Sequence, residues 1–406
     1  MGLPREVSRV REILAAARLE HVRYAIRDIA VLAEQLAREG KEILPLNIGD
    51  PLKFDFRTPP HLVEAVAKAM RDGKNGYAPS PGIGEALEAI RAEADRKGIR
   101  NIQSVFVTQG VSEAVDLCLT ALVNPGENVV TPSPEYPLYS AVLAKLGAEP
   151  NTYALDEASG WAPDLDDLRR KINSRTRGIV VINPNNPTGA VHGGKTLEAI
   201  VELARRHSLV IFADEIYDKL ILDGEPHVSV ARLAPDAPVV TFNGLSKAYL
   251  VPGWRLGWGV VSGDAHALKP YVEGIHKLLR ARLSANHPVQ YAVRPALEGP
   301  QDHVSETIQK LRSRRDLTVE CCSRTPRLSC VAPQGAFYAF PRVDIREEDE
   351  SFVKQLLISK QVLVVHGSGF GQAPGTRHFR IVFLPDEAML RRAFHGIREF
   401  LESGKQ

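Results

Sequence analysis

The sequence predicts an α/β fold in which a large domain, with a mostly parallel sheet between helices, carries a smaller α/β domain built from both chain ends. From about residue 100 to residue 262, short β-rich runs alternate with helix-periodic segments, which is typical of a parallel sheet covered by helices. The length of 406 residues also exceeds one ordinary domain. We expect an N-terminal arm and part of the small domain over 1–58, the large domain over 59–298 and the small C-terminal domain over 299–406.

The predicted strands follow one another along the chain in a regular order. The runs VFVTQG, NVVTPSP, GIVVINP and LVIFADEIY are apolar, and segments with helical periodicity separate them. Outside this region, residues 28–39 indicate an amphipathic helix and HFRIVFLP, from residue 378, carries strand signals. Ligands of parallel sheets bind beyond the carboxyl ends of the strands. The polar residues after the runs are therefore expected at one edge, where one site could use all five: Gly110, Ser133, Asn183, Asp214 and Ser246.

Composition and charge exclude several classes of protein. Hydrophobic residues make up 44% and charged residues 25%, and the net charge of +2 gives no general attraction to nucleic acid or to an anionic membrane. The longest apolar runs are far shorter than the roughly 20 residues that span a bilayer. The N-terminus lacks a hydrophobic signal core, so we expect a cytoplasmic protein. The four cysteines form no CxxC pair, and we expect neither a disulfide framework nor a metal site.

One short motif suggests a different function. The string GAVHGGKT, from Gly189 to Thr196, matches the phosphate-loop pattern of nucleotide hydrolases, and LVIFADE resembles the acidic strand that holds magnesium in them. A phosphate loop starts directly after its strand, however, and NPNNPT, with two prolines, separates the apolar run from Gly189. Nucleotide hydrolysis is therefore a weaker alternative, in which Lys195 would bind phosphate instead of being a solvated charge.

The segment NGLSKAYLVPGWRLGW, residues 243–258, brings together the groups of one kind of chemistry. A strand ends, a polar turn presents Ser246 and Lys247, and Arg255 follows eight residues after the lysine. A lysine at the sheet edge is able to form an imine with an aldehyde cofactor, and the arginine and the hydroxyl suit a dianionic phosphate. Alone, Lys247 would be a surface charge and Arg255 half of a surface ion pair. Their combination indicates a pyridoxal phosphate site.

Further motifs make the sequence resemble the class I aminotransferases of the fold type I pyridoxal phosphate family over essentially the whole chain. NPNNPTG at 183, ADEIY at 213, SK at 246, GWRLGW at 253 and FRIVFLP at 379 fall in the order and spacing of that family. Two longer stretches, which start at residues 161 and 242, are most similar to bacterial alanine (glutamate–pyruvate) aminotransferases. The resemblance implies the fold type I architecture, pyridoxal phosphate as cofactor and transamination as the activity.

The resemblance also implies a role for each matched position. The expected catalytic residues are Lys247, which would carry the cofactor as an imine, Asp214, which would keep the pyridine nitrogen protonated, and Tyr217, which would bond to the ring oxygen. The expected cofactor-binding residues are Gly110, Val111, Ser112, Tyr136, Asn186, Asp214, Tyr217, Ser246, Lys247 and Arg255. As alternatives, Asp214 would cap the next helix, and Ser112 would cap the helix at whose start it lies.

Two positions bear on how the phosphate is held. Tyr77 matches the tyrosine that the family contributes to the phosphate of the neighbouring subunit, so the resemblance implies a homodimer. Many family members carry a serine three residues before the lysine, and this sequence has Gly244 there. Phosphate binding is then expected to depend more on Ser246, on Arg255 and on the helix start near Gly110.

The resemblance further indicates how a substrate would be bound. Arg380 matches the arginine that binds the substrate α-carboxylate, to which a planar guanidinium is suited. Gly49 and Asn186 match residues that border the substrate. Arg27 and Tyr24 lie in a stretch shared with similar enzymes, and we expect Arg27 to bind the distal carboxylate of glutamate.

The predicted function is ping-pong transamination between an L-amino acid, alanine or glutamate, and a 2-oxo acid, pyruvate or 2-oxoglutarate. The same residues can also serve a C–S lyase or a decarboxylase, because the cofactor does not fix which bond breaks. A pyridoxal-binding regulator is a non-enzyme alternative, although no basic helix-turn-helix candidate precedes residue 20. The expected partners are small amino and 2-oxo acids, with no nucleic acid and no membrane.

Overall fold

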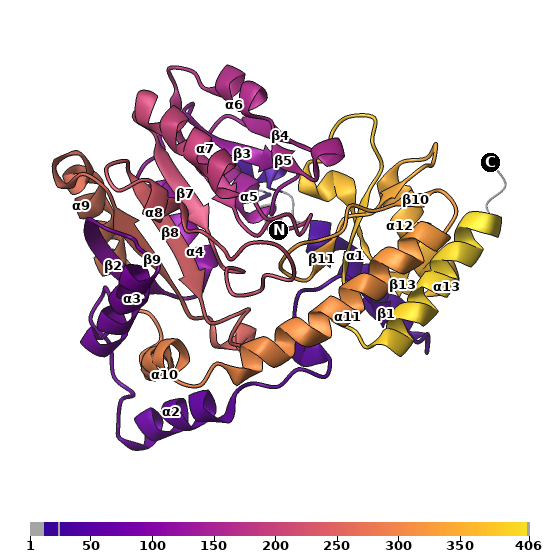
Figure 1. Ribbon diagram of the computed structural model, residues 1–406, viewed down its shortest axis with the longest axis horizontal. Helices are drawn as coiled ribbons and strands as arrows, with labels where there is room; N and C mark the ends of the chain where they lie inside the picture. The colour runs from indigo at the N-terminus through magenta and orange to yellow at the C-terminus, as the bar shows by residue number, and fades with distance from the viewer. Residues whose placement is uncertain (1–11, 23–24, 404–406) are drawn as a thin grey trace, which may run out of the picture.

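The computed structural model describes residues 12–22 and 25–403, and the largest sheet within those residues has eight strands. They lie in the order β2-β9-β8-β7-β6-β3-β4-β5 (Figure 1). β9 is antiparallel to both neighbours and β5 is antiparallel to β4, whereas all other neighbours are parallel, so the predicted fold is confirmed. The strands are β2 Ile102–Thr108, β3 Asn128–Ser133, β4 Thr152–Asp156, β5 Ala162–Pro163, β6 Thr176–Ile182, β7 Val210–Asp214, β8 Val239–Gly244 and β9 Gly257–Ser262.

Helices cover both faces of this sheet, because successive residues of a strand point to opposite sides. In β6, Val180 and Ile182 join one core cluster with side chains of α4, α5 and α9, whereas Ile179 and Val181 join another with side chains of α3, α7, α8 and α10. α2 packs beside α10. These helices, with α6, are α2 Pro60–Arg71, α3 Gly84–Arg96, α4 Val111–Thr120, α5 Leu138–Lys145, α6 Leu165–Lys171, α7 Gly194–Arg206, α8 Val230–Leu233, α9 Ala265–Ala281 and α10 Val293–Glu298.

The C-terminal elements form small sheets, into which the N-terminal part of the chain is built. β1 lies parallel to β13, with Leu44 opposite Val362, and α1 packs against α12 and β14. The helix expected over 28–39 is α1, and the strand expected near the C-terminus is β15, between β11 and β14. The predicted domain limits stay a prediction. These elements are α1 Ala25–Arg38, β1 Leu44–Pro45, α11 Asp302–Arg324, β10 Leu328–Ser329, β11 Tyr338–Ala339, β12 Arg342–Val343, α12 Asp349–Lys360, β13 Val362–Leu363, β14 Val365–His366, β15 Phe379–Val382 and α13 Glu387–Ser403.

A buried arginine joins the segment before α2 to the long helix α11, which runs beside the C-terminal strands in Figure 1. Arg314 is 6% exposed and donates hydrogen bonds to both carboxylate oxygens of Asp55, at 2.7 and 2.8 Å. Burial raises the pKa of Asp55, but hydrogen bonds from Arg314 and Lys310 outweigh it and hold that pKa below its usual value. Because hydrogen bonds between charged groups are stronger than those between neutral groups, the chain that leads from β1 to α2 is held against α11.

Three further observations concern the properties predicted from composition. Among the described residues, no helix combines the length and the apolar character that crossing a bilayer requires. The four cysteines carry free thiols. In the same part of the chain, no group of three or more His, Cys, Asp or Glu side chains could hold a metal ion. The cellular compartment stays a prediction.

A pair of glycines lets three elements approach closely at one end of the sheet. Gly244, the last residue of β8, lies opposite Gly257, the first residue of β9. A Cβ atom on Gly257 would lie 2.5 Å from the backbone nitrogen of Val111, and one on Gly244 would lie 2.7 Å from the carbonyl oxygen of Leu256. Such distances are far inside van der Waals contact, and the atoms they meet are backbone. The first turn of α4 can therefore rest directly against β9 only because these residues lack a side chain.

We expect Gly257→Ala to lower the free energy of unfolding by about 1–3 kcal/mol, because the added methyl group must push α4 away from β9. Gly84→Ala is the matched control, since a Cβ atom at this first residue of α3 would meet nothing within 4 Å. The control should leave the free energy within about 1 kcal/mol of the wild type. Urea unfolding of the three proteins measures both effects, and equal stability of the two variants would contradict the close approach.

Candidate active site

A cavity of about 470 Å³ opens at the carboxyl ends of the parallel strands and reaches the C-terminal strands. It brings together eleven of the residues that the sequence predicted for the site: Gly49, Val111, Ser112, Tyr136, Asn186, Asp214, Tyr217, Ser246, Lys247, Arg255 and Arg380. Gly110 stands next to it, in contact with Arg255. Tyr77 does not line the cavity and is 80% exposed. Tyr24 lies outside the described residues, and Arg27 lies in α1 with its side chain outside the description.

Two polar residues expected at this edge do not line the cavity. The hydroxyl of Ser133 donates a hydrogen bond to the carbonyl oxygen of Gly371. The side chain of Asn183 accepts from the backbone nitrogen of His192 at 2.9 Å and donates to its carbonyl oxygen at 3.3 Å. The expectation that all five residues share one site is therefore wrong for these two. Their side chains satisfy backbone groups of neighbouring loops instead.

The Lys247 amine is enclosed within the cavity. Its Nζ donates to the carbonyl oxygen of Gly49 at 2.9 Å and lies 5.7 Å from the centre of the Phe337 ring. Burial, followed by the positive charge of Arg380, lowers the pKa of Lys247 to about 8. A lower pKa increases the uncharged fraction of the amine near neutral pH. The amine is thereby able to act as a nucleophile and as a base.

The Asp214 carboxylate belongs to the last residue of β7 and lines the same cavity. Its Oδ2 accepts from the Tyr139 hydroxyl at 3.0 Å and its Oδ1 accepts from the Ile216 backbone nitrogen at 3.3 Å. Burial raises the pKa of Asp214 to about 6, against these two hydrogen bonds, which lower it. The group is thus mainly ionised at pH 7 and able to accept a proton or a hydrogen bond from a cationic ligand. The alternative in which Asp214 caps the next helix is wrong, because a turn follows β7 and the next helix, α8, begins only at Val230 with Ser229 as its N-cap.

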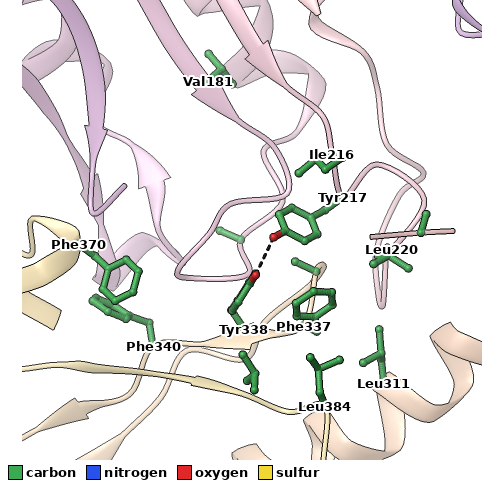
Figure 2. Packing of buried hydrophobic residues seen from close by; sticks show 14 of the residues in the cluster. Val181, Ile216, Tyr217, Leu220, Leu311, Phe337, Tyr338, Phe340, Phe370 and Leu384 are labelled. Carbon is green, nitrogen blue, oxygen red and sulfur yellow. Dashed lines mark hydrogen bonds between the residues drawn. The ribbon is translucent and has the colours of Figure 1, made fainter. Parts of the chain in front are cut away.

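Tyr217 and Tyr338 meet in the centre of the site. Their hydroxyl oxygens are 2.8 Å apart, and Figure 2 shows this hydrogen bond between the segment after β7 and the C-terminal strand β11. Burial, followed by the neighbouring Tyr338, raises the pKa of Tyr217 well above its usual value. Tyr217 is therefore a hydrogen-bonding phenol at any physiological pH.

Arg380, on β15, is 2% exposed and lines the same cavity. It donates to the side-chain oxygen of Asn186 at 3.1 Å and to the carbonyl oxygen of Asn47 at 2.5 Å. Its guanidinium lies 4.6 Å from the centre of the Tyr338 ring and 4.7 Å from that of Phe370. A cation held between aromatic rings in a buried cavity is suited to bind a carboxylate.

The start of α4 and Arg255 form the cationic end of the cavity. Gly110 precedes the helix with a φ of 78° and provides no side-chain cap. The alternative in which Ser112 caps α4 is therefore wrong, because Ser112 is already the second residue of the helix. A Cβ atom on Gly110 would lie 2.5 Å from a guanidinium nitrogen of Arg255. Backbone N–H groups at a helix start beside a guanidinium make a site for an anion such as phosphate.

The absence of a side chain at Gly244 has a steric reason. Since a Cβ atom there would lie 2.7 Å from the Leu256 carbonyl oxygen, a serine does not fit this strand pairing as it stands. The hydroxyl available nearby belongs to Ser246, which is 7% exposed and lines the cavity.

The phosphate-loop motif does not form a phosphate loop. After β6, residues 183–193 intervene before α7, and within them the backbone nitrogen of Gly189 donates to Asn185, whereas that of Asn185 donates to Ala190. The turn is thus closed on itself, and Lys195 is exposed on α7. The junction of strand, loop and helix that nucleotide hydrolysis requires is missing.

Sequence reasoning missed two tyrosines of this site. Tyr139 lies in the first turn of α5, three residues after Tyr136, and nothing in that spacing tells that its hydroxyl reaches Asp214 at the end of β7. Tyr338 belongs to a short C-terminal strand without a polar turn, so no signal in the chain connected it to Tyr217.

The groups in the cavity fit pyridoxal phosphate. They provide a buried carboxylate for the pyridine nitrogen, an amine for the aldehyde and an anion site for the phosphate, and Gly110 and Gly257 keep that anion site free of Cβ atoms.

Comparisons with known proteins agree with this chemistry. The family model of aminotransferases of class I and II matches residues 41–397. The glutamate–pyruvate aminotransferase AlaA of Haemophilus influenzae is 42% identical over 96% of this chain and 98% of its own length. An alanine aminotransferase of Mycobacterium bovis is 40% identical over 98% of this chain and 95% of its own length.

Among solved structures, an alanine aminotransferase from Pyrococcus furiosus superimposes with a TM-score of 0.93 at 42% identity, over 96% of this chain and all of its own. Both the sequence and the fold are thus shared along nearly the entire length. The chain belongs to the aminotransferases of class I and II, enzymes that use pyridoxal phosphate to transfer an amino group from an amino acid to a 2-oxo acid.

Proposed function

We propose that this aminotransferase transfers an amino group between L-alanine and 2-oxoglutarate, and in the reverse direction between L-glutamate and pyruvate. The observation that carries the proposal is the cavity in which the Lys247 amine, the Asp214 carboxylate and the Arg380 guanidinium lie together. The choice of substrates is supported by relatives at 40 and 42% identity, which are named as alanine and glutamate–pyruvate aminotransferases.

In this proposal Lys247 is the covalent anchor of the cofactor and then the base of the reaction. Bound pyridoxal phosphate supplies an electron sink for the charge that remains on the substrate when its Cα proton leaves. The Lys247 amine, with its lowered pKa of about 8, removes that proton and returns it, so a single group serves both proton transfers. Arg380 holds the substrate α-carboxylate, and Gly49 borders the substrate while its carbonyl oxygen directs the amine at 2.9 Å.

The residues around Asp214 tune the cofactor. Asp214 pairs with the pyridine nitrogen, and the hydroxyl of Tyr139 keeps the carboxylate in place at 3.0 Å. Tyr217 and Asn186 donate to the ring oxygen. Because the Asn186 side-chain oxygen accepts from Arg380 at 3.1 Å, its amide N–H₂ is left as the donor. Tyr136, at the cavity wall, stacks on the ring.

The phosphate is held by Ser246, Arg255 and the N–H groups of Gly110, Val111 and Ser112. We further propose a homodimer in which Tyr77 reaches the phosphate of the neighbouring subunit. An 80% exposed tyrosine that lies away from the cavity of its own chain supports this arrangement, since a large aromatic ring is seldom left in water without a partner surface.

The alternatives have less support. A C–S lyase or a decarboxylase would use the same lysine and carboxylate, but the relatives that match nearly the whole chain are transaminases. A nucleotide hydrolase would need a phosphate loop, which the turn at Gly189 does not form.

Lys247→Ala should abolish transamination between alanine and 2-oxoglutarate, with a fall of at least about 10⁴-fold, because the anchor and the base are lost together. Lys195→Ala is the control, since this exposed lysine of the phosphate-loop motif should be dispensable. Pyruvate formation and the visible absorption of the protein measure the outcome. An active, yellow Lys247→Ala variant would refute the role of Lys247, and an inactive Lys195→Ala variant would contradict the expectation that the exposed lysine is dispensable.

Arg27→Ala should lower kcat/KM for glutamate by about 10-fold or more, because a charge-assisted bond to the distal carboxylate is lost, and it should affect alanine much less. Arg38→Ala, in the last turn of the same helix, is the matched control, since its side chain is 82% exposed. Steady-state kinetics with both amino donors separate the effects. Equal loss for glutamate and alanine would rule out the proposed contact of Arg27.

A further inference from the structure

Tyr338 contacts three residues that are proposed to take part in the reaction. Its hydroxyl is 2.8 Å from that of Tyr217, and its ring centre is 4.6 Å from the guanidinium of Arg380. A Cβ atom on Gly49 would overlap the Tyr338 hydroxyl, so the two residues are in close contact there as well. Tyr338 is 2% exposed, and neither a motif nor the proposed chemistry assigns it a role.

The strand register places the Tyr338 ring against Arg380. β11 pairs antiparallel with β15, with Tyr338 opposite Val382. Arg380 lies two residues from Val382 and thus on the same face of β15, within diagonal reach of the ring. The Phe370 ring is also within 4.7 Å of the guanidinium, so aromatic rings restrict where this cation can move.

The hydroxyl of Tyr338 is hydrogen-bonded to Tyr217, on the cofactor side of the cavity. Tyr217 comes from the segment after β7, and Figure 2 shows its hydroxyl and that of Tyr338 meeting between the two parts of the chain. The two rings are perpendicular, with centres 5.6 Å apart, which suits an edge-to-face contact. A phenol that receives a hydrogen bond becomes a better donor to a third group. Either hydroxyl could donate in this pair, but the proposed function directs the single Tyr217 proton to the cofactor, so that Tyr338 is the donor and Tyr217 the acceptor. Tyr338 is therefore placed to direct the Tyr217 hydroxyl and to strengthen the bond that Tyr217 donates.

We propose that Tyr338 is a positioning residue for transamination, whose ring fixes the Arg380 guanidinium toward the substrate carboxylate and whose hydroxyl fixes the Tyr217 hydroxyl toward the cofactor. The inference rests on the proposed roles of Arg380 and Tyr217. It makes Tyr338 the direct link between carboxylate binding and the electronic state of the cofactor. The ring and the hydroxyl have separate tasks, so two substitutions can test them one at a time.

Tyr338→Phe keeps the ring and removes the hydroxyl, whereas Tyr338→Leu removes both. Tyr271→Phe is the matched control, because the Tyr271 hydroxyl donates a buried hydrogen bond of 2.9 Å to the Cys118 carbonyl oxygen, in the core cluster formed with α4, α5 and α9. The Tyr271→Phe substitution thus removes a buried tyrosine hydrogen bond outside the cavity. Thermal unfolding of each holoenzyme establishes that the variants are folded.

Two readouts without turnover separate the tasks. The first is the dissociation constant of propionate, an unreactive carboxylate, followed by the change that it causes in the absorption of the bound cofactor. Tyr338→Phe should bind propionate within about 2-fold of the wild type, and Tyr338→Leu about 10-fold more weakly, since only the latter loses the cation–ring contact. The second is the pH titration of the visible absorption, whose midpoint should rise by about 0.5 unit in both variants, because Tyr217 becomes a weaker donor.

In steady-state kinetics with alanine, Tyr338→Phe should lower kcat by about 10-fold with little change in KM, and Tyr338→Leu should also raise KM. Tyr271→Phe should change none of these quantities. The proposal is overturned if propionate binds equally well to Tyr338→Leu and the wild type, or if the titration midpoint of Tyr338→Phe equals that of the wild type. If Tyr338→Leu does not fold, the midpoint of Tyr338→Phe decides. A wild type that is inactive with alanine would refute the proposed substrates alone, since both readouts without turnover remain measurable.

Discussion

The structure depends on the burial of three ionisable groups in one cavity. Removing a charge from water costs several kcal/mol unless hydrogen bonds or an opposite charge compensate for it. Here each group has its own partners: Tyr139 and the Ile216 backbone for Asp214, Asn186 and the Asn47 carbonyl oxygen for Arg380, and the Gly49 carbonyl oxygen for Lys247. The remaining cost is visible in the pKa values, lowered to about 8 for Lys247 and raised to about 6 for Asp214. Both values lie near neutral pH, where proton transfer is efficient.

The fold supplies these partners from distant parts of the chain. The parallel strands end at a common edge, which brings Asp214, the last residue of β7, and Lys247, which follows β8, to the same side. Arg380 comes from β15, and Gly49 follows β1, which is itself paired with β13. The cavity is therefore formed only when both chain ends are folded against the large sheet. The glycines at 244 and 257 allow the helix start and the strands to come close enough for an anion site.

The sequence predicted much of this arrangement, because strand alternation and short motifs are local properties of a chain. The mostly parallel sheet, the helix α1 and the cavity position of Lys247, Asp214 and Arg255 were all expected. Contacts between segments that are distant in the sequence were not expected. The alternation of strands and helices predicts that Ser133 and Asn183 lie at the ends of strands. It does not predict that their side chains form hydrogen bonds with backbone groups of other loops. For the same reason Tyr338, which lies 121 residues from Tyr217 in the chain, gave no signal.

The central claim is that this cavity carries out transamination in two separate half-reactions with alanine as the first donor. The most direct measurement mixes the holoenzyme with L-alanine in the absence of any 2-oxo acid and counts the pyruvate released. The account predicts a single pyruvate per bound cofactor, together with loss of the yellow absorption, and recovery of that absorption when 2-oxoglutarate is added. Release of pyruvate only in the presence of an acceptor, or retention of the yellow absorption after alanine is added, would contradict it.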